Sequence, residues 1–309
     1  RTASIWSAWR PLMEIGIDPP STTITFVGDI MLAREVERAL IKNGVDWPFA
    51  EIKSMWVESD LVVGNYEATV REVYRYEGKV LAFDVLPELN AGLKNAGFTH
   101  LSLANNHGDD FGAAVTQQTR KTIEALGIAT FGDPIESEQH IARMDGAIPI
   151  SLIGFHAFLE EPSSLINVIK EENRLGRFVI VFPHWGNEYQ SLPSRAQRDT
   201  ANIFITAGAD MIIGAHPHVI QPVEIVDGVP VAWSLGNFIF DQDWSVPTQE
   251  GMILTVTVTD ETVTIAPIPI SIKGRRALPM EAVRAQEIVK TVGAPTGQLT
   301  VDRAPKGPR

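Results

Sequence analysis

Polar residues with catalytic or ligand chemistry follow directly after short apolar runs at five places in this sequence. Runs such as 24–28 (ITFVG), 61–64 (LVVG) and 178–182 (FVIVF) have the length and continuous hydrophobicity of strands buried on both faces. The residues that follow the five runs are Asp29, Glu67, Asn106 with His107, His184, and His216 with His218. In open α/β sheets, ligands bind at the carboxyl ends of the strands. The sequence therefore predicts one polar site built from several strand ends.

The residue types at these strand ends indicate a divalent-metal centre. Carboxylates, amide oxygens and imidazoles together are typical metal ligands. His216-Pro217-His218 is the strongest single element, because two imidazoles on a proline-stiffened turn can point at neighbouring ions. On its own this pair is equally compatible with two surface histidines. His184 at a separate strand end favours the metal site, and Asn106 is a ligand candidate through its side-chain oxygen.

Two further candidates have chemical rather than ligating roles. His107 stands beside Asn106 and is a candidate to protonate a leaving group or to stabilise charge. Asp109 or Asp110 would orient its imidazole as a carboxylate partner, the alternative being a solvated acidic loop. Glu188 in the run HWGNE either faces a substrate or is merely exposed.

Composition excludes several classes of protein. The 309 residues contain no cysteine, so disulfides, thiolate ligands and a cysteine nucleophile are absent from this sequence. A hydrophobic content of 44% is ordinary for a globule with a large core, and the net charge of −12 argues against nucleic acid as a partner. The sequence has no apolar run of about 20 residues, the length needed to cross a bilayer. It begins at Arg1, and we expect any signal peptide or anchor to lie upstream of it.

Helix-like segments that end at glycine alternate with strand-like runs from Thr22 onward. A glycine after a helix supplies the positive φ of a C-cap, and each helix here feeds a strand. This pattern predicts a layered α/β fold. The helices are expected at 87–96, 115–126 and 194–207, ending at Gly97, Gly127 and Gly208, and residues 1–21 are expected to form an N-terminal arm.

The C-terminal part of the chain is richer in strands. Segments 229–235, 252–259 and 261–272 are β-rich, which suggests a second sheet or the edge of one. Residues 273–309 lose this periodicity and are mildly basic, so they are predicted to form a flexible tail with one short helix near 281–292.

With these motifs in order, the chain resembles the poly-γ-glutamate capsule synthesis (CapA) family, whose domain is similar to calcineurin-like metallophosphatases. The resemblance implies an α/β (α+β) fold over residues 22–272, a four-layer αββα sandwich of two facing mixed sheets. The matching stretches are TFVGDIMLAR (25–34), LVVGNYE (61–67), LANNHGDDFG (103–112), FPHWGNEYQ (182–190), GADMIIGAHPHVIQPVEI (208–225) and SLGNFIFD (234–241).

The resemblance also implies site roles, with two departures from the metallophosphatase pattern. Met31 stands where that pattern has a histidine, and Asn65 stands where it has an acid, with Glu67 as the substitute bridging acid. Two divalent ions, Mn, Fe or Zn, would be bound. The candidate ligands are Asp29, Glu67 and His218 for the first ion, and Glu67, Asn106, His184 and His216 for the second. Asn65 is a further metal-ligand candidate. His107 and Asp110 are the catalytic candidates, and Arg34, Glu188 and Asn237 are the substrate-binding candidates.

The leading hypothesis is a metal-dependent hydrolase that acts on poly-γ-glutamate or a related cell-envelope polymer. The alternative is a non-catalytic, metal-dependent polymer-binding component of a capsule synthesis or export complex. An intracellular nucleotide phosphodiesterase is less favoured. The expected partners are an anionic polymer or small-molecule substrate and membrane-bound capsule synthesis proteins. The expected location is the extracytoplasmic face of the bacterial cell membrane, with the cytoplasm as the alternative.

Overall fold

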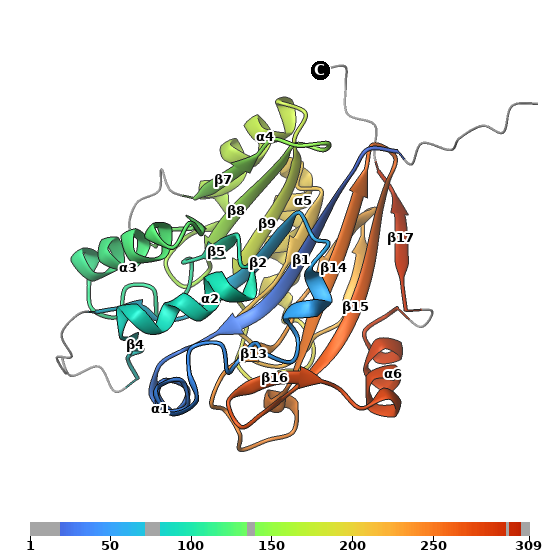
Figure 1. Cartoon of the computed structure of the whole chain (residues 1–309). Coiled ribbons are helices and arrows are strands. Elements are labelled where there is room, and N and C mark those ends of the chain that lie inside the picture. Colours follow the sequence, from blue (N-terminus) through green and yellow to red (C-terminus); the bar gives the residue numbers. More distant parts are fainter. Residues whose placement is uncertain (1–18, 72–80, 135–139, 295–296, 304–309) are drawn as a thin grey trace, which may run out of the picture.

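Two mixed β-sheets face each other in the computed structural model, and helices cover their outer faces (Figure 1). The structure describes residues 19–71, 81–134, 140–294 and 297–303. This is the four-layer αββα sandwich that the sequence predicts. Within the described ranges, every helix is too short or too polar to cross a bilayer.

The larger sheet is built around the first strand of the chain. Its order is β16-β15-β14-β1-β2-β5-β6, with β13 also beside β1 and β17 beside β15. β1 runs parallel to β2 and antiparallel to β14, so the sheet is mixed. The strands are β1 (Ser21–Ile30), β2 (Leu61–Tyr66), β5 (His100–Ser102), β6 (Ala129–Phe131), β13 (Asn237–Ile239), β14 (Glu250–Thr259), β15 (Thr262–Lys273), β16 (Arg276–Pro279) and β17 (Leu299–Asp302).

The smaller sheet has the order β11-β12-β10-β9-β8-β7. Its central strands are parallel and its edge strands antiparallel. The strands are β7 (Ile141–Met144), β8 (Ile150–His156), β9 (Phe178–His184), β10 (Met211–Ile213), β11 (Val223–Val226) and β12 (Val229–Ala232), and a separate short pair consists of β3 (Thr69–Val70) and β4 (Asp84–Val85).

The helices α1 to α5 lie outside the sheets and bury apolar side chains against them. Val36, Leu93 and Ile123 pack on the outer face of the larger sheet, and Ile169 and Phe204 pack on the smaller one. The α-helices are α1 (Arg34–Asn43), α2 (Ala91–Ala96), α3 (Ala113–Ala125), α4 (Ile166–Arg174), α5 (Arg195–Ala207) and α6 (Ala282–Thr291). The short 3₁₀ helices are η1 (Lys53–Trp56), η2 (Pro87–Asn90), η4 (Pro162–Leu165) and η5 (Pro247–Gln249).

The helix ends follow the sequence signals. The Ser194 hydroxyl caps α5 by accepting a hydrogen bond from the Gln197 backbone N–H, and the Gln197 side-chain oxygen accepts one from the Ser194 backbone N–H. Gly208 ends the same helix with φ of 109°. Both signals are local, which is why the sequence predicts this helix well.

The main core lies between the sheets. Phe26 of β1 and Phe182 of β9 come from different sheets, and their ring centroids are 6.1 Å apart. Both belong to one buried cluster with residues of β8, β10 and β14. This packing holds the strand ends of the two sheets at fixed positions relative to each other.

The C-terminal segment differs from the expected flexible tail beginning at residue 273. β16 and β17 both pair with β15, and Val263 lies opposite Val301. The expected helix near 281–292 is present as α6, and its Ile288 is buried in the core between the sheets. The open edge of β15 and this apolar contact explain the order. Residues 1–18 of the expected N-terminal arm lie outside the described residues.

A candidate metal centre at the strand ends

The site begins with three strands that place polar residues side by side. Asp29 of β1 lies in register with Asn65 of β2 and with Asn237 of β13. Both pairings are parallel, so the three side chains leave the same edge of the larger sheet. The smaller sheet contributes His184 at the end of β9, in register with His156 at the end of β8.

Gly28 permits the close approach of β13. A Cβ atom at this position would lie 1.8 Å from the Gly236 carbonyl oxygen. The Asp29 backbone N–H donates to that same oxygen at 3.1 Å. A side chain at Gly28 would therefore push away the strand that carries Asn237.

The first half of the site is a carboxylate pair that faces an imidazole. His218 Nδ1 lies 3.2 Å from Asp29 Oδ2, and His218 Nε2 lies 3.7 Å from Glu67 Oε1. Asn237 Oδ1 lies 3.0 Å from His218 Nδ1. Asp29, Glu67 and His218 are buried, and their donor atoms lie within 4.8 Å of one another.

The second half of the site gathers an amide oxygen and two imidazoles. His184 Nε2 lies 2.7 Å from Asn106 Oδ1 and 3.0 Å from His216 Nδ1. The His216 backbone N–H donates to Asp29 Oδ2 at 3.3 Å, which joins this half to the first. The structure thus brings together the strand ends that the sequence predicts to converge.

Asn65 is oriented as a donor rather than as a ligand. Its Nδ2 group donates to Asp29 Oδ1 at 2.8 Å and to Glu67 Oε2 at 3.3 Å. Its Oδ1 atom accepts a hydrogen bond from Asn105 Nδ2 at 3.1 Å, so the amide oxygen points away from the acids. The structure therefore differs from the expectation that Asn65 is a ligand: the side chain positions the two carboxylates.

Left-handed backbone conformations are concentrated at this site. His216 has φ of 96° and His218 has φ of 59°, and Arg34 and Tyr189 also have positive φ. Such conformations are uncommon for residues other than glycine and cluster at functional sites. The His216-Pro217-His218 turn is thus held in an unfavourable conformation that aims both rings into the site.

Burial and close charges raise the pKa of both Glu67 and His218 in the first half of the site. Burial raises the pKa of the Glu67 carboxyl well above its usual range, and His218 only partly offsets this. Burial also lowers the pKa of His218, but Glu67 and Asp29 outweigh it and raise the pKa to about 9. The pair thus holds protons that a cation would displace.

The two histidines of the second half are neutral. Burial, with the neighbouring histidines, lowers the pKa of His184 well below its usual range. Burial and the charge on His218 lower the pKa of His216 to about 3. Neutral imidazoles have a free lone pair for a metal ion.

The donor set fits a divalent cation. Buried carboxylates are costly unless they are paired or coordinate a metal. Glu67 Oε1 is buried without a hydrogen-bond partner among the described residues, and His218 Nε2 lies 3.7 Å from it. Mixed nitrogen and oxygen donors are ligands that Zn, Mn and Fe accept. This part of the molecule is therefore a candidate metal site, whose ion and stoichiometry belong to the proposal below.

His107 and Asp110 form a dyad beside this cluster. His107 Nδ1 lies 2.8 Å from Asp110 Oδ2, and the ring of Phe83 stacks on the imidazole with a centroid distance of 3.8 Å. The charge on His107 influences the pKa of both His184 and His216, so the dyad lies near the second half of the site.

The three substrate-binding candidates, Arg34, Glu188 and Asn237, differ in burial. Arg34 forms an ion pair with Asp241, with Nη2 2.8 Å from Oδ1, and its guanidinium lies 5.2 Å from the centre of the Phe83 ring. Glu188 is exposed on the loop after β9. Asn237 is buried against His218 and also donates to the Gln242 side chain at 2.9 Å.

Three exposed aromatic side chains border the site and mark its mouth, and the sequence does not predict their place there. Phe158, Tyr189 and Trp244 are 49%, 44% and 60% exposed. The Phe158 ring lies 4.6 Å from that of His216, Tyr189 lies 6.2 Å from His218, and Trp244 lies 6.0 Å from Tyr189. Tyr189 directly follows Glu188 in the motif, but sequence alone gives no sign that the three rings meet.

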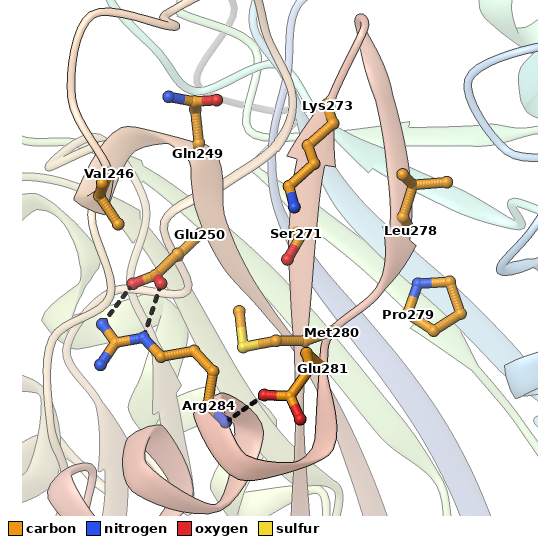
Figure 2. A pocket seen from close by; sticks show the side chains of 10 residues that line it. All are labelled: Val246, Gln249, Glu250, Ser271, Lys273, Leu278, Pro279, Met280, Glu281 and Arg284. Atoms are coloured by element: carbon orange, nitrogen blue, oxygen red, sulfur yellow. Dashed lines mark hydrogen bonds and ion pairs between the residues drawn. The ribbon is translucent and has the colours of Figure 1, made fainter.

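A separate cavity of about 510 Å³ lies between β14, β15, β16 and the start of α6 (Figure 2). Arg284 in this cavity forms two 2.8 Å hydrogen bonds with Glu250, and Glu281 accepts from the Arg284 backbone N–H. The Arg284 and Glu250 side chains of this cavity thus pair with each other. The residues that line the cavity are different from those of the histidine cluster.

Comparison with known proteins identifies the family. The profile described as "Bacterial capsule synthesis protein PGA_cap" matches residues 23–242. The chain belongs to this family. The match includes every residue of the histidine and carboxylate cluster, from Asp29 to His218, and extends to Asn237. Membership of the CapA family, which the motifs predict, is thereby confirmed.

Two relatives from Bacillus are each 31% identical to this chain. The PGA biosynthesis protein CapA of Bacillus subtilis matches over 243 residues, which are 72% of this chain and 64% of the relative. The capsule biosynthesis protein CapA of Bacillus anthracis matches over 277 residues, 81% of this chain and 67% of the relative. The chain thus spans about two thirds of the length of these relatives.

More distant similarities are found as well. A probable polyglutamine synthesis accessory protein of Mycobacterium tuberculosis is 23% identical over 312 residues, 79% of this chain and 82% of the relative. The crystal structure of TT1561 of Thermus thermophilus is similar with a TM-score of 0.45 at 13% identity, covering 77% of this chain and 98% of that one.

Proposed function

We propose that this chain is a metal-dependent hydrolase that processes poly-γ-glutamate or a related anionic cell-envelope polymer. One observation carries the proposal: buried carboxylates, an amide oxygen and three imidazoles from five strand ends meet within hydrogen-bond distances. Such a set is costly to bury unless a cation neutralises it.

The ligand roles follow the two halves of the cluster. Asp29, Glu67 and His218 would hold one divalent ion, and Glu67, Asn106, His184 and His216 would hold a second. Mn, Fe and Zn all suit these donors. Bound ions of this kind lower the pKa of a water ligand and stabilise charge on a phosphoryl or acyl oxygen.

The protein residues around the ions have separate tasks. His107 would transfer a proton to or from the reacting group, and Asp110 positions its ring by accepting a hydrogen bond at 2.8 Å. Asn65 orients the acids. Arg34 would attract an anionic substrate group, although it shares its charge with Asp241. The exposed rings of Phe158 and Trp244 offer an apolar contact for the substrate at the mouth.

The substrate class comes from the relatives. The names of the Bacillus proteins place them in PGA or capsule biosynthesis. We also propose a location at the extracytoplasmic face of the cell membrane, with membrane-bound capsule synthesis proteins as partners, and the involvement of these relatives in capsule synthesis supports it. The net charge of −12 makes a nucleic acid partner unfavourable.

The decisive experiment combines metal analysis with a substrate panel. Protein purified without chelator is assayed for Mn, Fe and Zn, and then for hydrolysis of phosphoesters and of γ-glutamyl amides. We expect turnover that is lost after chelation and restored by one of these metals. A metal content below about a tenth of an equivalent, together with no gain in thermal stability on adding Mn or Zn, would contradict a metal site.

A second function is a non-catalytic polymer-binding component of a capsule synthesis or export complex. Met31 favours it, because this residue is buried in the outer core and supplies no metal ligand at the first half of the site. Asn65 favours it as well, because an amide donor replaces an acid there. If the metal-loaded protein hydrolyses neither substrate class, yet binds polyglutamate in a manner that His216→Ala abolishes, this second function replaces the first.

A further inference from the structure

We propose that Glu188 is a further ligand of the first of the two ions, to which it supplies a carboxylate beside His218. A Glu188 carboxylate oxygen and one ring nitrogen each of His216 and His218 all lie within 4.8 Å of one another. The inference rests on the metal centre of the proposed function and extends it to a residue outside the two ligand sets above.

The backbone holds Glu188 against the histidine turn. Glu188 lies four residues after His184, at the end of β9, and its neighbour Tyr189 donates its backbone N–H to the Pro217 carbonyl at 2.8 Å. Pro217 stands between the two histidines, so this hydrogen bond ties the two loops together. Gly186 and Tyr189, which flank Glu188, both have positive φ. The hydrogen bond and the constrained backbone therefore hold Glu188 next to the two histidines.

Charge supports a ligand role over a substrate contact. Glu188 shares His218 as a neighbour with Asp29 and Glu67, because His218 belongs to both groups of possible ligands. A third carboxylate near two buried ones is repulsive unless a cation lies between them. The same negative charge would also repel an anionic polymer that approached the mouth directly. A cation at the histidines removes both difficulties.

The number of protein ligands in the first half of the site leaves room for Glu188. The first half of the site has three protein donors, from Asp29, Glu67 and His218. A catalytic zinc ion with three protein ligands keeps a position for water and can expand to five ligands, so a fourth protein donor is compatible with a bound water. Met31 adds none, because its side chain lies in the outer core. Glu188 approaches from the exposed side and reaches His218, which belongs to both groups of donors. It would thus bind the ion from the side that faces solvent.

The test is the affinity of the intact chain for Mn²⁺ and Zn²⁺ alone. Metal-free wild type, Glu188→Gln and Glu188→Asp are titrated calorimetrically and in competition with a chelator, and Mn²⁺ binding is followed by electron paramagnetic resonance. We expect Glu188→Gln to weaken binding about 10-fold or more, Glu188→Asp to restore part of it, and the Mn²⁺ spectrum to change. Glu161→Gln is the matched control, because Glu161 is an exposed glutamate whose side chain caps no helix.

The outcomes separate this inference from the proposed function. If wild type binds neither metal, the metal centre itself is wrong, and the inference fails with it. If wild type binds metal and His216→Ala loses it, but Glu188→Gln binds within about twofold of wild type, only the role of Glu188 is overturned. Thermal unfolding of the metal-free proteins shows whether each variant is folded, and we expect no change for an exposed residue such as Glu188.

Discussion

Asp110 Oδ2 lies 2.8 Å from His107 Nδ1 and accepts the Phe83 backbone N–H at 2.7 Å. The second hydrogen bond fixes the carboxylate, and the carboxylate in turn fixes the imidazole. With Nδ1 engaged and Phe83 stacked on one face, the ring presents Nε2 as its remaining proton-transfer atom. This geometry suits a positioned acid or base, and among the described residues His107 belongs to neither group of possible metal ligands.

His107→Ala is therefore expected to lower kcat by about 10²–10⁴-fold, the range for loss of a general acid or base, while metal content stays at the wild-type level. Steady-state kinetics and elemental analysis of the same preparation check both parts. His216→Ala serves as the comparison and should lose both metal and activity. Loss of metal from the His107 variant would show that the ring is a ligand.

Asn65→Asp is expected to destabilise the metal-free protein by about 1–3 kcal/mol, because it removes two hydrogen bonds to buried carboxylates and adds a third acid. Saturating Mn²⁺ should reduce this loss, since the new carboxylate can bind the ion. Urea unfolding with chelator and with Mn²⁺ measures the difference, and Asn202→Asp, on the exposed surface of α5, is the control. Equal stability of wild type and variant without metal would disprove the role assigned to Asn65.

The burial of His100 predicts that part of the stability of the folded protein depends on pH. Burial lowers its pKa to about 4, so between this value and the ordinary pKa of about 6.5 the unfolded chain binds a proton that the folded chain does not. Its contribution is thus complete above about pH 6.5 and falls as the pH drops toward 4, by about 2 kcal/mol at pH 5.

The measurement compares urea unfolding of wild type and His100→Gln at pH 7.5 and pH 5. The variant should lose about 2 kcal/mol less than wild type over this interval. Parallel pH dependence of the two proteins would show that His100 does not titrate as its burial implies.

Ile288→Ala tests whether α6 belongs to the domain. Ile288 is 7% exposed within the core between the sheets, so its truncation is expected to cost about 2–4 kcal/mol in the free energy of unfolding. Val283 on the same helix is 63% exposed, and Val283→Ala should change stability by less than about 0.5 kcal/mol. If both variants unfold like wild type, α6 does not contribute to the core.

Much of the site could be predicted from the sequence because its signals are local. An apolar run followed by Asp29 or His184 identifies a strand end, and the parallel pairing of such strands makes their ends meet. The capping box at Ser194 likewise depends only on neighbouring residues. Orientation is different: whether Asn65 turns its oxygen or its nitrogen toward Asp29 depends on Asn105, which lies 40 residues away in the chain.

Contacts between distant segments were decided by the tertiary structure alone. Val256 pairs with Ile24 across more than two hundred residues, which places the C-terminal hairpin beside the first strand. Phe158 and Trp244 reach the mouth of the site from separate loops, and no periodicity in either segment indicates it. Sequence patterns report the environment of each segment, because burial and backbone conformation are local. Which segments become neighbours depends on how the apolar faces of both sheets pack together, and that is a property of the whole chain.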